Sequence, residues 1–441
     1  MAPHDRQAHS NRRTFLGDVA AVAIAAAPAL AAARAVGREA AVPAGERLTL
    51  GVIGFGPRCK YVLGEMLKFA DVQCVAVADV QAVKRAEGKG FVDGHYGNTD
   101  CRAYGDMREL LARPDIDCVL IATGDRWHGK AAMMAAEAGK DVYCEKPCGL
   151  TIDVCRRIAE TMRRTGRIFQ AGTQRRSVPN FIKVKDLVQA GRIGGLQEMH
   201  ASVYVPSLNN DWLPAQPTPP VEECDWNVWL GPAPWRPYNK DYLGRGWRGV
   251  YDFEAGARLL DWGVHTVDLC QWVKRADDTA PVEFIPADTH ITCRYADGVT
   301  LTLEFLAEPF KDRGPQFNTK LGTCPVRFVG SEGALETGDA GGIDAPAALE
   351  GELPESVKRV AGTDASAHAR NFFDCVKSRT PAVCNADVMR RSHVVAHAAA
   401  NAWILGRTLG FDPATETFTS GGKPDAEANG LRSRPERDPW A

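Results

Sequence analysis

The chain has 441 residues, of which 45% are hydrophobic, and its formal net charge is only -2. A chain of this length and composition can bury a large core and should form about two domains. Its charge is nearly balanced and no lysine and arginine cluster alternates with aromatic residues, which argues against nucleic acid as a partner.

The N-terminus has the features of an export signal. Arg12 and Arg13 precede an alanine-rich, modestly apolar stretch at 19–33. Paired arginines before such a stretch are typical of the twin-arginine (Tat) pathway. A membrane anchor is the alternative, but it needs about 20 strongly apolar residues. We predict a signal peptide over 1–33 and a linker over 34–47. The product is then periplasmic, exported folded by the Tat translocase, and not stably inserted in the membrane.

A nucleotide-binding half is predicted over 48–172. The apolar run 48–53 reads as a strand, and Gly54-Phe55-Gly56 follows it into a helical pattern at 61–69. Glycines there let the backbone approach a pyrophosphate, and a helix N-terminus donates N–H groups to it. The third glycine position of this motif is Cys59, so the motif by itself is weak evidence.

A second signal supports the nucleotide site. The apolar run 75–78 ends on Asp79, about twenty residues after the glycines, where a carboxylate can accept hydrogen bonds from both hydroxyls of an adenosine ribose. Its charge would repel a 2′-phosphate, so NAD is favoured over NADP. Lys84 and Arg85 lie near enough in sequence to leave NADP open.

Two further apolar runs extend the pattern. The run 117–122 leads through a polar turn at 123–128 into an alanine-rich helical pattern at 130–138, and the run 141–147 reads Asp-Val-Tyr-Cys-Glu-Lys-Pro. Strands alternating with helices predict an α/β domain with a doubly wound parallel sheet, a Rossmann domain. Such a sheet binds ligands at the carboxyl ends of its strands. Because a proline ends the last strand, Lys146 is a candidate for the site; the alternative is a solvated edge charge.

A second domain, α+β with a large and predominantly antiparallel sheet, is predicted over 173–410. A polar cluster at 172–176 opens it, either beside the same crevice or as a salt-bridged surface turn. The final run, 411–441, is polar and rich in proline and glycine, which predicts an extended arm, with a neighbouring subunit as one partner. The expected strands of this domain are 197–205, 289–294, 299–304 and 326–328, and its expected helices are 180–190, 368–377 and 387–409. A helix at 151–165 and a strand at 168–171 are expected to continue the sheet of the nucleotide-binding half.

Asp261 and His265 are four residues apart. On a helix they share a face, and a carboxylate beside an imidazole favours a proton-accepting histidine. An inconsequential helix-surface pair is the alternative. Asp268 lies one turn further on and is expected to have a structural role.

Together these motifs resemble the Gfo/Idh/MocA oxidoreductases, named for glucose-fructose oxidoreductase and inositol dehydrogenase. The resemblance rests on Gly54-x-Gly56, Asp79, the Trp127-His128 turn, Glu145-Lys146-Pro147 and the Asp261-x-x-x-His265 element, and it covers nearly the whole chain after residue 47. It implies hydride transfer between a secondary carbinol of a sugar, glycoside or polyol and the nicotinamide of NAD.

In such a reaction His265 takes the hydroxyl proton, Lys146 hydrogen-bonds the same oxygen, and Asp261 lies beside them. The resemblance assigns the cofactor to Gly54, Phe55, Gly56, Arg58, Asp79, Thr123, Trp127, His128, Glu145 and Lys146. It assigns the substrate to Gln174, Arg175, Tyr204 and Trp235. Trp235 belongs to a tryptophan-rich loop, 206–253, whose rings suit either sugar stacking or core packing.

An exported dehydrogenase has no obvious nicotinamide pool for recycling, so a tightly bound cofactor and a closed redox cycle are expected. Two alternatives stay open: a redox-neutral, NAD-dependent glycosidase or lyase, and a non-catalytic sugar-binding protein. A homo-oligomer, dimer or tetramer, is also expected. The thirteen cysteines should be reduced, because Tat substrates fold before export. Cys144, Cys148 and Cys155 match no zinc spacing, so no metal site is predicted.

Overall fold

A computed structural model describes residues 42–244, 246–307, 316–358 and 362–440. The export signal predicted for 1–33 lies outside these residues. The chain divides after residue 47 into two units. The described part of the first contains a short 3-10 turn, η1 (Ala44–Glu46), and the second, 48–441, is compact. Across the described ranges, every helix is too short or too polar to cross a membrane.

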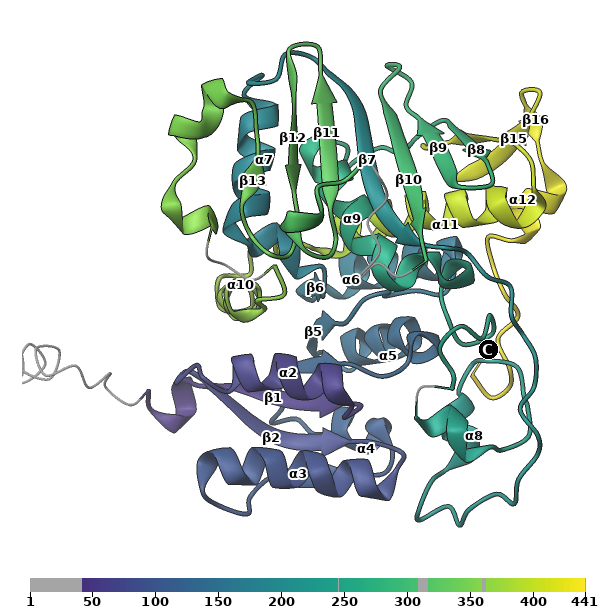
Figure 1. Cartoon of the computed structure of the whole chain (residues 1–441). Coiled ribbons are helices and arrows are strands. Elements are labelled where there is room, and N and C mark those ends of the chain that lie inside the picture. Colours follow the sequence, from purple (N-terminus) through teal and green to yellow (C-terminus); the bar gives the residue numbers. More distant parts are fainter. Residues whose placement is uncertain (1–41, 245, 308–315, 359–361, 441) are drawn as a thin grey trace, which may run out of the picture. The chain divides into compact units, whose positions relative to one another are not determined.

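The second unit begins with a six-stranded parallel sheet in the order β3-β2-β1-β4-β5-β6 (Figure 1). The order reverses between β1 and β4, and in such sheets the ligand crevice lies at the carboxyl ends of those two strands. The doubly wound sheet predicted from the sequence is therefore confirmed. Its strands are β1 (Leu48–Ile53), β2 (Val72–Ala78), β3 (Arg102–Tyr104), β4 (Cys118–Ile121), β5 (Asp141–Cys144) and β6 (Phe169–Ala171).

Two helices of this domain begin earlier than predicted. The first starts at Pro57, since a proline has the φ angle that the first helical position needs. The fourth starts at Asp125, because a carboxylate is stabilised at a helix N-terminus. Trp127 and His128 are therefore helical residues and not part of a preceding turn. The helices are α2 (Pro57–Met66), α3 (Ala82–Tyr96), α4 (Met107–Leu111), α5 (Asp125–Glu137) and α6 (Ile152–Thr165).

The second domain contains a ten-stranded sheet in the order β13-β12-β11-β7-β10-β9-β8-β14-β15-β16. Only the β7–β10 pair is parallel, so the predominantly antiparallel sheet is confirmed. The strands are β7 (Leu196–Tyr204), β8 (Glu283–Pro286), β9 (His290–Arg294), β10 (Thr300–Leu306), β11 (Val326–Gly330), β12 (Gly333–Thr337), β13 (Ile343–Asp344), β14 (Leu409–Asp412), β15 (Thr417–Ser420) and β16 (Lys423–Pro424).

Helix α9 (Leu259–Val273) is the central helix of this domain. It packs between β7 and α11 (Ala386–Leu405), and it is buried almost all round, as an apolar helix should be. Helix α10 (Ser366–Ser378) packs back on α2, whereas α11 packs on α6. Helix α11 ends earlier than predicted, because Gly406 adopts a left-handed conformation that caps it.

The remaining helices are short. They are α7 (Pro179–Gln189), α8 (Trp226–Leu230), α12 (Ala426–Gly430), and the 3-10 turns η2 (Gln174–Ser177), η3 (Lys240–Leu243), η4 (Gly256–Arg258), η5 (Thr319–Leu321), η6 (Ala347–Glu352) and η7 (Glu355–Lys358).

The sequence predicted an extended arm over 411–441, but much of this run forms regular elements. Strands β14 to β16 and helix α12 occupy most of 409–430. Phe411 and Phe418 are buried and pack against each other, and Phe284 of β8 packs on Phe411. These isolated aromatic residues hold the strands on the sheet despite the polar composition around them. Only the last residues, 431–440, run without a regular element.

Candidate active site

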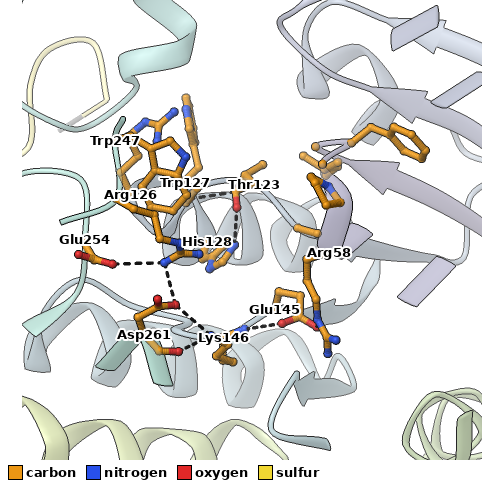
Figure 2. A pocket seen from close by; sticks show the side chains of 18 of the residues that line it. Arg58, Thr123, Arg126, Trp127, His128, Glu145, Lys146, Trp247, Glu254 and Asp261 are labelled. Atoms are coloured by element: carbon orange, nitrogen blue, oxygen red, sulfur yellow. Dashed lines mark hydrogen bonds and ion pairs between the residues drawn. The ribbon is translucent and has the colours of Figure 1, made fainter. Parts of the chain in front are cut away.

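A cavity of about 1000 Å³ opens at the carboxyl ends of the parallel strands (Figure 2). Residues after β1, β2, β4 and β5 line one side, and residues of the 206–253 loop and of α9 also contribute. This is the crevice that the strand order predicts. All the residues assigned to the cofactor from the sequence line it, namely Gly54, Phe55, Gly56, Arg58, Asp79, Thr123, Trp127, His128, Glu145 and Lys146.

The glycine turn after β1 is shaped for close approach. Gly54 has φ +84°, and a Cβ there would lie 2.8 Å from Thr123 Cγ2 and 2.9 Å from its Cα, so only glycine fits. Gly56 is the N-cap of α2 and contributes no side-chain cap. The first N–H groups of α2 are therefore left for an anion.

Asp79 is fixed at the end of β2. Its Oδ2 accepts a hydrogen bond from the N–H of Phe55 (2.8 Å), and its Oδ1 accepts one from the N–H of Gln81 (2.9 Å). Burial raises the pKa of Asp79, although these two bonds oppose the rise. A carboxylate held in this way at the cavity rim can still accept hydrogen bonds from ribose hydroxyls.

The two cations near Asp79 are both engaged. Lys84 Nζ pairs with Glu87 (2.9 Å). Arg85 Nη1 donates to the carbonyl oxygens of Asp79 (2.9 Å) and Val80 (3.1 Å). Both side chains thus have partners within the chain, which favours NAD over a 2′-phosphorylated cofactor.

Lys146 lies at the end of β5, where the Lys146–Pro147 peptide is cis. Its side chain is 11% exposed, and Nζ donates to the backbone carbonyl of Asp261 and to Asp261 Oδ1 (3.2 Å). An ammonium has three donors, so one is left for a ligand. Figure 2 shows Lys146 between Asp261 on one side and Glu145 on the other, with Arg58 beyond Glu145. Glu145 Oε1 accepts from Arg58 Nε (2.8 Å).

Asp261 does not pair with His265, which the helical spacing had suggested. Its Oδ1 accepts from Lys146 and lies 2.8 Å from Arg248 Nη1. Burial works to raise the pKa of Asp261, but the charges of Lys146 and Arg248 bring it below its usual value. A shared face of a helix thus did not identify the partner, because residues from two other segments reach Asp261.

His265 is buried at the cavity wall, and its Nδ1 has no hydrogen-bond partner among the described residues. Burial, together with the charges of Arg175, Lys146 and Arg58, holds the pKa of His265 well below its usual value. The imidazole is therefore neutral at neutral pH and is able to accept a proton.

His128 and Trp127 mainly join segments. His128 Nδ1 lies 2.7 Å from the carbonyl oxygen of Pro147, and burial lowers its pKa. This bond fixes the turn that follows Lys146. Trp127 Nε1 donates to the carbonyl of Val228 (2.8 Å) in the 206–253 loop.

Three of the four residues predicted to bind the substrate line the cavity, and one does not. Gln174, Arg175 and Tyr204 line the cavity. Trp235 does not line it: this side chain is 57% exposed and packs edge-on against Trp212, with ring centres 6.4 Å apart. Tyr204 lies under the guanidinium of Arg258, 4.5 Å from its ring centre.

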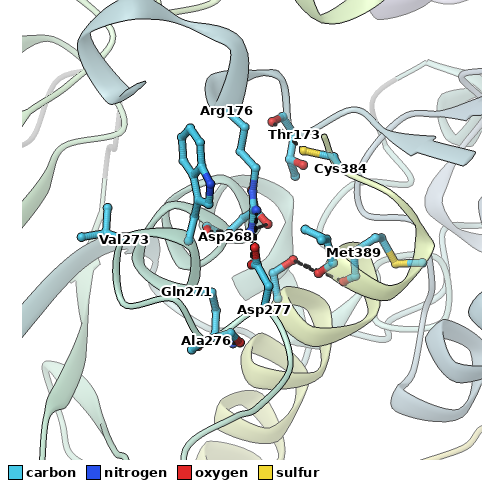
Figure 3. Close-up of polar contacts among 12 residues, drawn as sticks. Thr173, Arg176, Asp268, Gln271, Val273, Ala276, Asp277, Cys384 and Met389 are labelled. Atoms are coloured by element: carbon cyan, nitrogen blue, oxygen red, sulfur yellow. Dashed lines mark hydrogen bonds and ion pairs between the residues drawn. The ribbon is translucent and has the colours of Figure 1, made fainter. Parts of the chain in front are cut away.

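The arginines after β6 are buried and do not form a surface turn. Arg175 donates twice to Asp339 (2.7 and 2.8 Å), and its Nη1 has no partner in the described chain. Arg176 binds Asp268 through Nε (2.7 Å) and Nη2 (2.8 Å), as Figure 3 shows. Asp268 therefore anchors α9, the helix that carries His265, and has the structural role expected.

Sequence reasoning missed an acidic cluster beside Lys146. Arg248 Nη1 lies 2.8 Å from Asp261, 3.3 Å from Glu254 and 3.9 Å from Asp125. Burial, with the charges of Asp125 and Asp261, raises the pKa of Glu254 to about 7. Nothing in the spacing of these residues indicated that they meet, because a loop and two helices supply them.

The arrangement suits proton and hydride chemistry. A lysine donor and a neutral histidine lie on the wall of a cavity that also contains the glycine turn and Asp79. Among the described residues, no three histidine, cysteine, aspartate or glutamate side chains lie together so that they could hold a metal ion. All thirteen cysteines are buried, and none of them forms a disulfide bond.

Comparisons with known proteins identify the family of each domain. The family described as "Oxidoreductase family, NAD-binding Rossmann fold" matches residues 48–173. Its companion, "Oxidoreductase family, C-terminal alpha/beta domain", matches 203–307 and 335–441. Together the two matches cover most of the chain.

Two curated relatives are dehydrogenases. The D-xylose 1-dehydrogenase (NADP(+)) of Hypocrea jecorina is 37% identical over 122 residues, which are 28% of this chain and 31% of that protein. Inositol 2-dehydrogenase 2 of Saccharopolyspora erythraea is 31% identical over 172 residues, 38% and 49% of the two chains. The chain spans half or less of the length of these two relatives.

Solved structures show the same fold. The myo-inositol 2-dehydrogenase of Lactobacillus plantarum aligns with a TM-score of 0.59 at 16% identity, covering 83% of this chain and 100% of that one. The aldose-aldose oxidoreductase of Caulobacter crescentus, complexed with glycerol, aligns with a TM-score of 0.57 at 18% identity, with the same coverages.

Proposed function

Because the chain belongs to the Gfo/Idh/MocA family of oxidoreductases, we propose that it oxidises or reduces a secondary carbinol of a sugar, glycoside or polyol with NAD. The observation that carries this proposal is that Lys146 and the neutral His265 line the same cavity as Gly54 and Asp79. The xylose and inositol dehydrogenases among its relatives support the substrate class.

The residues present fit a dinucleotide. The turn at Gly54 would be filled by any Cβ, and the uncapped N-terminus of α2 suits a pyrophosphate. Asp79 suits the adenosine ribose. When bound, the nicotinamide supplies the hydride acceptor or donor.

The chain's own residues supply the proton chemistry. Neutral His265 takes the proton of the substrate hydroxyl, and the free donor of Lys146 stabilises the negative charge that develops on that oxygen. Asp261 orients Lys146 through its carbonyl and carboxylate oxygens. Arg175, with its unpartnered Nη1, offers a donor to a further substrate oxygen.

Single-turnover kinetics test this assignment. Lys146→Ala and His265→Ala should each lower kcat by roughly 10² to 10⁴ with NAD still bound, and the two effects should be strongly non-additive. Asp261→Asn should cost less. Lys68→Ala, which removes an exposed pair with Glu65, is the matched control. Near-parental rates in both single variants would refute the placement of the site.

The same assay separates the alternatives. Purified protein is loaded with NAD and mixed with a panel of sugars and glycosides while the nicotinamide absorbance is followed. Net reduction with an oxidised sugar as product supports the oxidoreductase. Release of an aglycone without net reduction identifies a redox-neutral glycosidase, and binding without any change in absorbance identifies a sugar-binding protein.

We also propose Tat-dependent export to the periplasm, based on Arg12, Arg13 and the stretch 19–33. Replacing both arginines with lysine should leave folded, cofactor-loaded protein in the cytoplasm; an unchanged periplasmic yield would contradict export by this route. A homo-oligomer is proposed as the working form, and a monomeric mass by light scattering would refute it.

A further inference from the structure

A segment of the second domain forms part of the cavity wall. Residues 222–244, which we call the strap, include α8 and η3. Its cavity-lining residues are Val228, Trp229, Leu243 and Gly244, and the residues that line the same cavity around Asp79 include Val80, Gln81 and Met107. The strap therefore contributes to the site at which the adenosine end of a dinucleotide would lie.

Hydrogen bonds tie the strap to the rim of the Rossmann domain. The N–H of Ala82 donates to the carbonyl of Glu223 (2.8 Å), just after the end of β2. Trp127 Nε1, in the first turn of α5, donates to the carbonyl of Val228 (2.8 Å). The strap is thus attached to the start of α3 and to the start of α5.

Arg126 joins the strap to the cavity. Its guanidinium lies 3.5 Å from the ring centre of Trp229, and its Nε donates to the Trp229 carbonyl (2.8 Å). Burial lowers the pKa of Arg126 to about 9, although the charges of Asp125 and Asp79 oppose the change. Arg126 is 6% exposed, and its Nη1 has no hydrogen-bond partner among the described residues.

A buried donor without a partner is costly unless a ligand supplies an acceptor. Arg126 lines the cavity and is electrostatically coupled to Asp79. The ring nitrogens and hydroxyl oxygens of adenosine are acceptors of the required kind. Arg126, which the sequence analysis did not single out, is therefore suited to contact the nucleotide.

The last residues of the chain cover the outside of the strap. Arg437, in the run 431–440 that we call the C-terminal arm, donates from Nη1 to Asn227 Oδ1 (2.7 Å) and from Nη2 to the carbonyl of Gly231 (2.9 Å). Trp440 is buried and meets Trp127 edge-on, with ring centres 4.9 Å apart. Figure 1 shows the yellow end of the chain running beside α8.

We propose that the strap completes the dinucleotide site on its adenosine side and that the C-terminal arm locks the strap, so that a bound dinucleotide is released only when both open. The backbone and side-chain bonds described above join the nucleotide rim to the strap and the strap to the arm, and the Trp440–Trp127 contact joins the arm directly to α5. The proposal rests on NAD binding by the Rossmann domain and is independent of which substrate is oxidised.

The test measures release of NADH from the full chain without turnover. Protein loaded with NADH is mixed with a large excess of NAD, and the loss of bound-NADH fluorescence gives the release rate. Arg437→Ala removes the side-chain bonds to the strap and should raise this rate about tenfold or more. Arg432→Ala is the comparison: Arg432 lies in the same arm but binds Asp153 of α6 (2.9 Å). Its loss leaves the bonds from Arg437 to the strap in place, so release should rise clearly less than in Arg437→Ala.

The outcomes separate the lock from other effects. Asn227→Ala removes the partner of one Arg437 bond and should raise the release rate less; the double variant should equal Arg437→Ala alone, because both changes break the same contact. Parental release in Arg437→Ala, or equally fast release in Arg432→Ala, would overturn the lock. If Arg437→Ala does not fold, parental release in Asn227→Ala overturns it. A chain that binds no NADH refutes the cofactor assignment itself.

Discussion

Asp268→Asn should destabilise the protein and disturb its active site. The Asp268 carboxylate accepts two bonds from Arg176 (2.7 and 2.8 Å), and both side chains are 1% exposed. The substitution keeps the shape of the side chain but removes its charge, so the Arg176 guanidinium is left buried without its main partner.

The magnitude follows from burial. Breaking a buried ion pair from one side costs about 3–5 kcal/mol. Arg176 keeps a second partner, Asp277, whose side chain is 35% exposed, so we expect the low end, about 3 kcal/mol. Residues 48–441 form one compact unit, and for a unit of that size roughly 1.2 °C of melting temperature corresponds to 1 kcal/mol. The melting temperature should therefore fall by about 4 °C.

Thermal unfolding and kinetics measure the two consequences. Asp297→Asn is the matched control. The Asp297 carboxylate is 58% exposed and pairs with Lys274, the residue that follows α9, and such exposed carboxylates contribute about 0–1 kcal/mol through their ion pairs. Because α9 carries His265, Asp268→Asn should also lower kcat. Equal melting temperatures for the two variants would refute the anchoring role of Asp268.

Two further predictions concern single side chains. Gly54→Ala should lower the melting temperature and abolish NAD binding, because φ is +84° and the new Cβ would overlap Thr123. Its control is Gly56→Ala, where φ is -109° and nothing lies within 4 Å of the new Cβ, so the melting temperature should stay unchanged. Equal losses of melting temperature in the two variants would contradict this account. Glu254→Gln should stabilise the protein more at pH 8 than at pH 5, by about 2–3 kcal/mol in urea unfolding. The pKa of Glu254 rises from its ordinary 4.5 to about 7 in the folded protein. Between these two pH values the folded parent binds more protons than the unfolded chain, so the parent loses stability as pH rises, whereas glutamine does not titrate. A pH-independent difference would refute the burial of Glu254 as the cause.

The sequence was most informative where strands are buried on both faces. The run 48–53 was predicted as a strand and matches β1 residue for residue, because strands of a parallel sheet are continuously apolar. The start of α5 was not predicted, since Asp125 to His128 are polar or aromatic and read as a turn. Arg126 and Trp127 are bonded to the strap, whereas His128 is bonded to Pro147. No local pattern reveals covering segments so distant in sequence.

Charged residues were the least predictable. Arginine is mostly exposed in proteins, yet Arg126, Arg175 and Arg176 are all buried. The last two find carboxylates on remote segments, in Asp339 and Asp268. Sequence supplies the charges but not the pairing, which depends on how β6, α9 and the end of β12 meet in space.

The partner of Asp261 decides the chemistry of His265. Had Asp261 paired with His265, as their spacing suggested, the carboxylate would have raised the pKa of the imidazole and favoured a protonated ring. Instead Lys146 and Arg248 hold Asp261, and burial, together with the charges of Arg175, Lys146 and Arg58, lowers the pKa of His265. The ring is therefore neutral when substrate arrives and has a nitrogen free to accept the hydroxyl proton. Its lowered pKa also makes it a weaker base than a histidine paired with a carboxylate would be, so the proton transfer depends on Lys146 stabilising the alkoxide that forms.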